Sequence, residues 1–134
     1  MSFMCFMFQC SSYRQAHTVN LVIERPDTRR LIARLREGDT TTEVIGWQPE
    51  QSAAGLLAAL DAAETDGYGE CFWPEPTGQY WWILKRDHES VEVVVLSSRG
   101  GAMGWQHVFR AVDGMRYVHE LIGGQLARHG LATS

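Results

Sequence analysis

The residues with the clearest chemical potential are five histidines, of which one falls in an apolar strand pattern. Residues 105–112 alternate in a way that places His107 on one face with Trp105 and Phe109. A histidine in this position predicts either a hydrogen-bonded core residue or a general base beside a pocket. A base needs an acid to orient it, and Asp113 and Glu120 are the candidates along the chain.

Other catalytic motifs are incomplete. His119-Glu120 lacks the second histidine that a zinc protease helix carries one turn later, because position 123 is glycine. The serines that follow the valine run have no G-x-S-x-G turn to present them. Cys71 lies within a strand pattern, and nothing in the sequence marks its thiol as activated. We therefore predict no metal, no cofactor and no catalytic residue, with His107 as the one candidate.

Three glycines occupy the segment SRGGAMG at residues 98–104. A strand pattern follows them, whereas a dinucleotide loop leads into a helix whose N-terminus binds the pyrophosphate. The segment predicts a hairpin connection. It also supports an alternative function, in which a small ligand or substrate binds between sheet and helices. That pocket would lie near Trp105, His107, Arg99 and the Gly100–Gly104 loop.

Charge is unevenly distributed along the chain. Residues 37–84 contain nine acidic residues and no lysine or arginine, within a net charge of −4. Such a stretch repels phosphate backbones, so we expect no nucleic acid partner. It predicts either a solvated acidic face or a patch for a basic protein. Glu50, Asp61 and Glu64 are the binding candidates, and an antidote-type protein that neutralises a basic partner is one concrete hypothesis.

Length and composition predict a single soluble domain. The chain has 134 residues and is 45% apolar, enough for one hydrophobic core. No apolar run approaches the roughly 18 residues of a membrane span, so no membrane partner is expected. Residues 1–17 form a tail or edge segment, and 18–134 form the domain. The three cysteines, Cys5, Cys10 and Cys71, predict reduced thiols in the cytoplasm.

The first half of the domain predicts two strands, a helix and one ambiguous segment. Residues 17–24 alternate as a half-buried strand, and residues 41–47 are β-branched and aromatic. Residues 49–67 form a helix that starts at a proline and ends at a glycine. Residues 27–37 fit a helix capped by Asp27 and equally fit a strand that leads into a hairpin. Residue preferences favour the helix slightly, and we predict a helix there.

The second half predicts a meander and a closing helix. Strands are expected at 68–73, on both sides of the break DHES, and at 105–112, and the helix covers 113–130 with Asp113 as its cap. Equal overhangs around the break pair Trp82 with Val95 and Trp81 with Leu96. The same register pairs Lys85 with Glu92, which is favourable across strands.

The fold class that follows is α+β, an antiparallel sheet with two or three helices packed mainly on one face. The hairpin face that carries Trp82 should be the core. The opposite face carries Trp81, Ile83 and Leu96, and an apolar face of that kind needs a cover. The cover is the N-terminal segment, a second subunit in a homodimer, or a partner protein. We therefore predict a small, cytosolic, non-catalytic binding protein.

Overall fold

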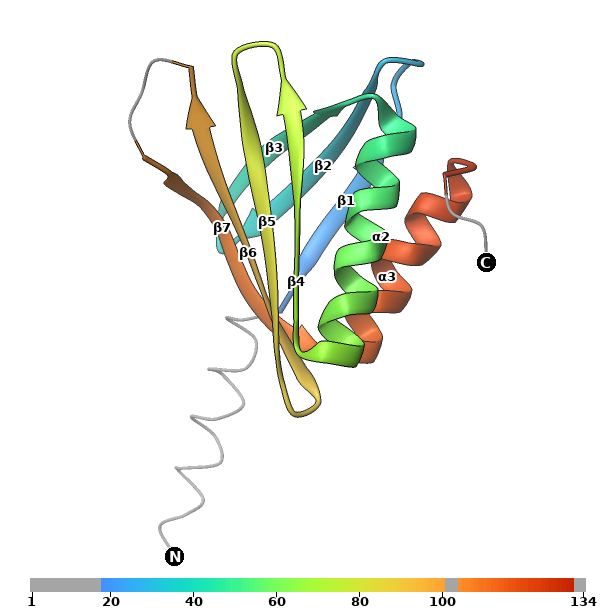
Figure 1. Cartoon of the computed structure of the whole chain (residues 1–134), viewed down its shortest axis with the longest axis vertical. Coiled ribbons are helices and arrows are strands. Elements are labelled where there is room, and N and C mark those ends of the chain that lie inside the picture. Colours follow the sequence, from blue (N-terminus) through green and yellow to red (C-terminus); the bar gives the residue numbers. More distant parts are fainter. Residues whose placement is uncertain (1–17, 101–103, 132–134) are drawn as a thin grey trace, which may run out of the picture.

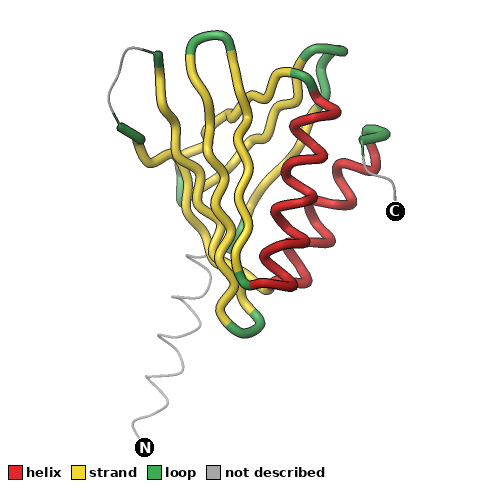
Figure 2. Tube along the Cα trace, viewed as in Figure 1, coloured by secondary structure: helices red, strands yellow, loops and turns green. Residues whose placement is uncertain are grey.

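The computed structural model describes residues 18–100 and 104–131. It contains two antiparallel sheets and two helices, which confirms the α+β class (Figure 1, Figure 2). The elements are, in chain order, β1 (Asn20–Glu24), β2 (Arg30–Glu37), β3 (Thr40–Trp47), α2 (Pro49–Asp66), β4 (Tyr68–Glu75), β5 (Gly78–Asp87), β6 (Ser90–Arg99), β7 (Gln106–Gly114) and α3 (Met115–Arg128). The predicted tail at residues 1–17 lies outside the described residues.

The first sheet has three strands in the order β1-β2-β3, and β2 corrects the helix predicted at 27–37. Asp27 does not cap a helix. Its carboxylate accepts the backbone N–H groups of Arg29 and Arg30 and so holds a turn. On the outward face of β2, Arg34 lies between Glu24 of β1 and Glu43 of β3, at 3.2 and 3.1 Å. The strand is favoured because it pairs this arginine on both sides while Leu31, Ala33 and Leu35 enter the core.

Helix α2 has the predicted limits. Pro49 occupies its first turn, and Gly67 ends it with a left-handed φ of 88°. Ala53, Leu56, Leu60 and Ala63 are fully buried and form the inward face of the helix. The helix packs closely on β4, because a Cβ added to Gly69 would overlap the carbonyl oxygen of Ala59.

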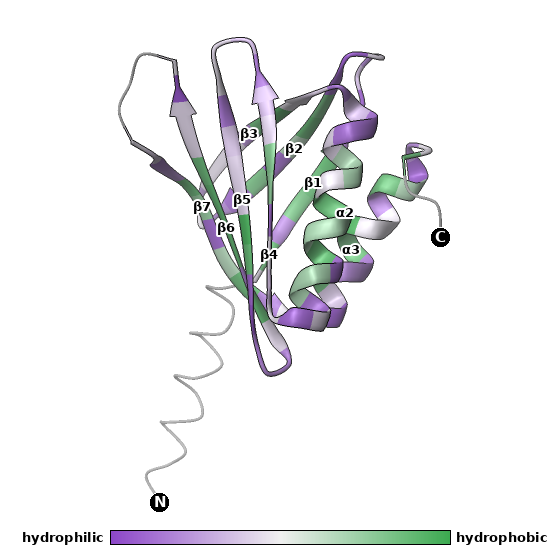
Figure 3. Cartoon of the chain, in the orientation of Figure 1, coloured by the Kyte–Doolittle hydropathy of each residue, from purple (hydrophilic) through white to green (hydrophobic). Residues whose placement is uncertain are grey.

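The second sheet is a meander in the order β4-β5-β6-β7. The predicted hairpin register is confirmed pair by pair, including Trp82 with Val95, Trp81 with Leu96 and Lys85 with Glu92. Figure 3 shows the short turn between β5 and β6 as hydrophilic, in keeping with a solvent-exposed DHES break.

One core joins both sheets and both helices. Trp82 is fully buried there, with its ring centroid 4.9 Å from that of Trp73. The indole N–H of Trp73 donates to the carbonyl of Ser52 at the start of α2. Figure 1 shows both helices on the same side of the four-stranded sheet, with the three-stranded sheet behind it. The predicted core face of the hairpin is therefore confirmed, but the core has a second sheet that the sequence did not reveal.

Helix α3 is bound to the first strand through Gln125. The Gln125 side chain accepts the N–H of Ile23 and donates to the carbonyl of Leu21, so it completes backbone groups on the open side of β1. Asp113 does not cap α3 as predicted. It accepts the backbone N–H of Val19 at 3.1 Å and so ties the start of β1 to the end of β7.

The paired glycines within α3 do not mark a close contact. A Cβ added to Gly123 or Gly124 would meet nothing within 4 Å. Neither helix in the described ranges is long and apolar enough to cross a membrane.

Candidate functional site

The outward side of the four-stranded sheet can be built from its registers. One rung across the sheet is Phe72, Trp81, Leu96 and His107, and the next is Glu70, Ile83, Val94 and Arg110. Cross-strand partners point to the same side of a sheet, so each rung forms a row on one face. We call this face the outer sheet surface, made of Tyr68, Glu70, Phe72, Trp81, Ile83, Val94, Leu96, Trp105 and His107.

Three rings on this surface touch one another. Phe72 stacks on Trp81 with ring centroids 5.6 Å apart, and Trp105 lies 5.2 Å from Trp81 and 6.2 Å from Phe72. We call these three residues the aromatic cluster. Phe72 keeps 46% of its surface exposed and Trp105 keeps 38%. Phe72 and Trp105 thus cover part of Trp81, and both of these rings are themselves partly open to solvent.

A β-bulge explains why Trp105 and His107 belong to this surface. The register between β6 and β7 shifts between Val95 and Leu96, so Phe109 pairs with Val95 while His107 pairs with Leu96. One extra residue in a strand reverses the facing of everything beyond it. Phe109 therefore enters the core, and the predicted apolar face shared by His107 and Phe109 is wrong.

Glu70 is the acidic residue that forms hydrogen bonds with aromatic side chains of this surface. Its Oε1 accepts the indole N–H of Trp81 at 2.8 Å and the hydroxyl of Tyr68 at 3.1 Å. Partial desolvation and this neighbouring carboxylate raise the pKa of Tyr68. Tyr68 remains 43% exposed, so the polar group lies within an accessible aromatic surface.

Charged pairs lie along the rungs on the β7 side of this surface. Arg110 of β7 pairs with Glu92 of β6, and Lys85 of β5 faces the same Glu92. Glu37, at the end of β2, accepts the backbone N–H of Arg110 and lies 3.3 Å from the imidazole Nε2 of His107. The apolar surface therefore ends in compensated charges, the usual arrangement of an interface rim.

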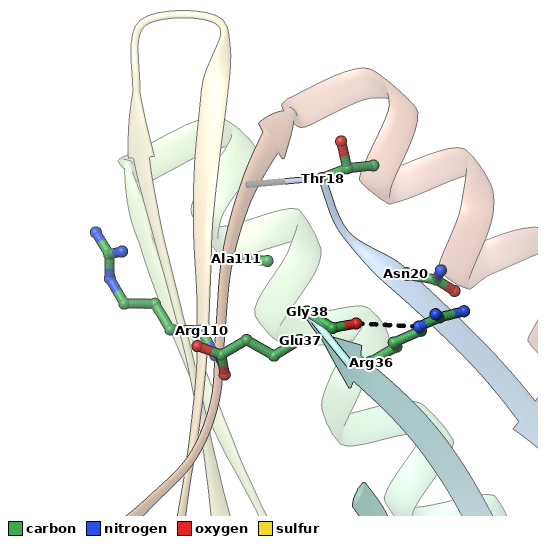
Figure 4. Close-up of a pocket in the computed structure, with 7 residues that line it drawn as sticks. All are labelled: Thr18, Asn20, Arg36, Glu37, Gly38, Arg110 and Ala111. Carbon is green, nitrogen blue, oxygen red and sulfur yellow. Dashed lines mark hydrogen bonds between the residues drawn. The ribbon is translucent and has the colours of Figure 1, made fainter. Parts of the chain in front are cut away.

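The environment of His107 differs from the one predicted for a general base. Its side chain is 52% exposed, and its acidic neighbour is Glu37, in place of Asp113 or Glu120. A hollow of about 190 Å³ lies beside it, lined by Thr18, Asn20, Arg36, Glu37, Gly38, Arg110 and Ala111 (Figure 4). Within this hollow Arg36 donates to the carbonyl of Gly38, as Figure 4 shows. No serine, threonine or cysteine that the structure describes makes a hydrogen bond to His107.

The predicted pocket residues are not brought to one cavity. Trp105 is in the aromatic cluster, and His107 lies next to Glu37. Arg99 lines a separate shallow hollow of about 460 Å³ at the turn between β4 and β5. Residues 101–103 of the predicted glycine loop lie outside the described residues.

Cys71 is not an activated nucleophile. It is a free thiol buried within β4. Burial raises its pKa to about 12, whereas an activated cysteine has a lowered pKa.

The acidic candidates on α2 have partners within the chain. Glu50 forms an ion pair with Arg25 at 2.8 Å. Asp61 and Glu64 both lie next to the imidazole of His119 on α3. The negative charge of α2 is therefore partly compensated, which the order of charges along the sequence did not reveal.

The sequence predicted Trp81, Ile83 and Leu96 on the outward face, did not predict Phe72 beside them, and assigned Trp105 to a pocket. The signal for Phe72 was present, because a two-residue turn at Pro76-Thr77 extends the register to pair it with Trp81. Comparison with known proteins adds no further guide, since no family model, curated protein or solved structure matches the chain.

Proposed function

We propose that the protein is a non-catalytic interaction protein that binds a partner protein through the outer sheet surface. The observation that carries the proposal is the aromatic cluster, in which Phe72 and Trp105 remain partly exposed. Soluble domains rarely leave contiguous apolar surface open unless another molecule covers it. Tryptophan and tyrosine are also the residues that most often dominate binding energy at interfaces.

The chemistry of this surface suits a basic partner. Glu70 presents a carboxylate next to the rings of Trp81 and Tyr68. A guanidinium group stacks on aromatic rings and pairs with carboxylates, so an arginine within an apolar surface is the natural complement. We propose that the protein acts as an antidote-type protein toward such a basic partner.

The acids of α2 then have a supporting role in the proposal. Glu50, Asp61 and Glu64 are exposed, but each has a basic neighbour, Arg25 or His119. We propose that they add to long-range attraction of a basic partner and that the outer sheet surface makes the contact. A cytoplasmic location is part of the same proposal, supported by the free buried thiol of Cys71.

A homodimer is the alternative cover for the outer sheet surface. Two copies that pack through the same face would bury both aromatic clusters around a two-fold axis. Light scattering on the purified protein separates this alternative from a basic partner. A dimer that becomes monomeric on substitution of Phe72 and Trp105 by serine would establish self-association. If the parent chain and the serine variant are both monomeric, the basic partner remains the proposed cover of the outer sheet surface.

The alternative function, a small-ligand site or enzyme near His107 and the Gly100–Gly104 loop, stays a prediction. Its residues do not share a cavity, because Arg99 lines a separate hollow, Trp105 lies in the aromatic cluster and His107 is half exposed. We favour the interaction function because its residues are in mutual contact.

The experiment that tests the proposal is capture of a partner from source cells followed by reconstitution with the purified partner. The test variant is Phe72→Ser/Trp105→Ser. The matched control is Tyr117→Ser, which removes an equally exposed aromatic ring from α3. We expect the test variant to weaken binding at least about 30-fold, since each hot-spot ring contributes on the order of 1–2 kcal/mol.

Two outcomes would contradict the proposal. Binding that survives the loss of both rings would exclude the outer sheet surface as the contact. Binding that is lost instead on charge reversal at Glu50, Asp61 and Glu64 would assign the contact to the acidic face of α2.

A further inference from the structure

Three ligand-type side chains meet where α2 and α3 lie side by side (Figure 1). Asp61 and Glu64 are one turn apart on α2 and so share a face of the helix. His119 comes from α3, with Nδ1 2.7 Å from Glu64 Oε1 and Nε2 3.5 Å from Asp61 Oδ1. One ligand atom from each residue lies within 4.8 Å of the other two.

The charge of this group differs from that of the acids that pair with arginine. Glu50, Glu43 and Glu92 each pair with an arginine. Asp61 and Glu64 pair with no lysine or arginine side chain in the described part of the structure. The nearby Arg86 donates to the backbone carbonyl of Glu64. Two carboxylates therefore face one imidazole and, when that ring is neutral, carry an uncompensated charge of about −2.

We propose that Asp61, Glu64 and His119 form a Zn²⁺ site that joins α2 to α3. An imidazole nitrogen and carboxylate oxygens bind zinc at about 2.0–2.2 Å, and three protein ligands leave a position for water. Zinc fits better than Ca²⁺ or Mg²⁺, because those ions prefer oxygen ligands alone. Glu64 contacts Nδ1 and Asp61 contacts Nε2, so one nitrogen binds the ion and the exposed carboxylate beside the other nitrogen turns toward it.

The three side chains differ in how firmly the fold holds them. The His119 side chain is 31% exposed and held between the helices, while those of Asp61 and Glu64 are 72% and 45% exposed and can adjust. The ligands are 55 residues apart in sequence, so the site exists only in the folded chain. Zinc should therefore stabilise the fold. The site lies on the two helices, and the proposal does not depend on the outer sheet surface.

The test uses Zn²⁺ alone, added to a chain with Cys5→Ser and Cys10→Ser so that these thiols do not compete. We expect saturable 1:1 binding by calorimetry. At a tenfold excess over its Kd, Zn²⁺ should raise the Tm by about 4 °C, and Mg²⁺ should not. His119→Gln should abolish both effects, and Asp61→Asn should weaken binding at least about 10-fold.

The matched control is His88→Gln. His88 also lies 2.8 Å from a carboxylate, that of Asp87, but it is 93% exposed and has no second acid within ion-pair distance in the described ranges. We expect this variant to bind Zn²⁺ like the parent chain. Equal binding by His119→Gln and the parent, or no saturable binding to the parent, would overturn the proposal and leave an interhelical ion pair. Should His119→Gln fail to fold, Asp61→Asn tests the same site, because Asp61 is the most exposed ligand and its loss disturbs the fold least.

Discussion

At the scale of single residues, Gln125 illustrates how one buried polar side chain can organise two distant elements. Its amide bonds both the N–H of Ile23 and the carbonyl of Leu21, and it is 9% exposed. Buried backbone groups left without partners cost about 1–3 kcal/mol each. The side chain therefore holds α3 against β1 by hydrogen bonds as well as by packing.

The first prediction follows from these two bonds. Gln125→Leu keeps the apolar packing but leaves both backbone groups unpaired, so we expect the free energy of unfolding to fall by about 2–4 kcal/mol. Urea denaturation measures the change. Gln106→Leu, at an exposed glutamine of β7, is the control and should change stability by less than about 0.5 kcal/mol. A small effect at Gln125 would show that water replaces the amide.

The second prediction concerns Cys71 and alkaline pH. The thiol has a pKa of about 12 in the folded chain and near 9.0 without burial. Between these values the unfolded chain loses a proton that the folded chain keeps, so stability falls as pH rises above about 9. Denaturation at about pH 8 and pH 10.5 should show a steeper loss for the parent chain than for Cys71→Ala. Equal slopes would show that Cys71 ionises normally.

At the scale of elements, β4 and α2 lie so close that their contact admits no side chain at Gly69. An added Cβ would overlap the carbonyl of Ala59, which is backbone and cannot move aside. We predict that Gly69→Ala costs about 3 kcal/mol or more in thermal denaturation. Gly124→Ala, in open space within α3, should instead stabilise the chain by about 1 kcal/mol, because alanine favours helix. Similar effects at both sites would contradict the close packing of β4 on α2.

The elements also show what a sequence can and cannot predict. The β5–β6 register was predictable, because alternation, equal overhangs and the Lys85–Glu92 pair all agree. The structure of segment 27–37 was not predictable from the sequence. Leu31, Ile32 and Leu35 satisfy a helical stripe, and Leu31 and Leu35 also satisfy strand alternation. Cross-strand partners on two neighbouring strands decided the outcome, and such partners are not visible along one segment.

The candidate site also has features that the sequence predicts and features that it does not. The position of Trp81 on the outward face of the sheet followed from local alternation alone. The position of Trp105 depends on the bulge at Val95 and Leu96, and one extra residue in a strand leaves no mark in a hydrophobic pattern. The meeting of Glu64 with His119 depends on how two helices pack, which no local pattern specifies.

At the scale of the whole molecule, the two faces of the four-stranded sheet have different environments. Its inner face holds Trp73 and Trp82 in the core, and its outer face holds the aromatic cluster. Removing a buried tryptophan creates a large cavity, whereas removing a half-exposed ring does not. The two faces of one sheet should therefore respond differently to substitution.

The fourth prediction compares these faces. Trp82→Ala should cost about 3–5 kcal/mol or prevent folding, while Phe72→Ser should cost less than about 1 kcal/mol. Phe72→Ser should also raise the solubility limit of the isolated chain, because it reduces the exposed apolar surface. Chemical denaturation and a precipitation assay measure the two quantities. Equal destabilisation by both substitutions would mean that the outer ring belongs to the core.

The contact between Gln125 and β1 also has a consequence for the order of synthesis. Strand β1 is made early, but α3, the helix that completes its free side, follows all the other described strands along the chain. Until α3 arrives, β1 offers unpaired backbone groups to any neighbouring nascent chain, the usual start of intermolecular strand addition. Chains that stop before Met115 should therefore aggregate during translation, and the folding of α3 onto β1 becomes the step that protects this strand.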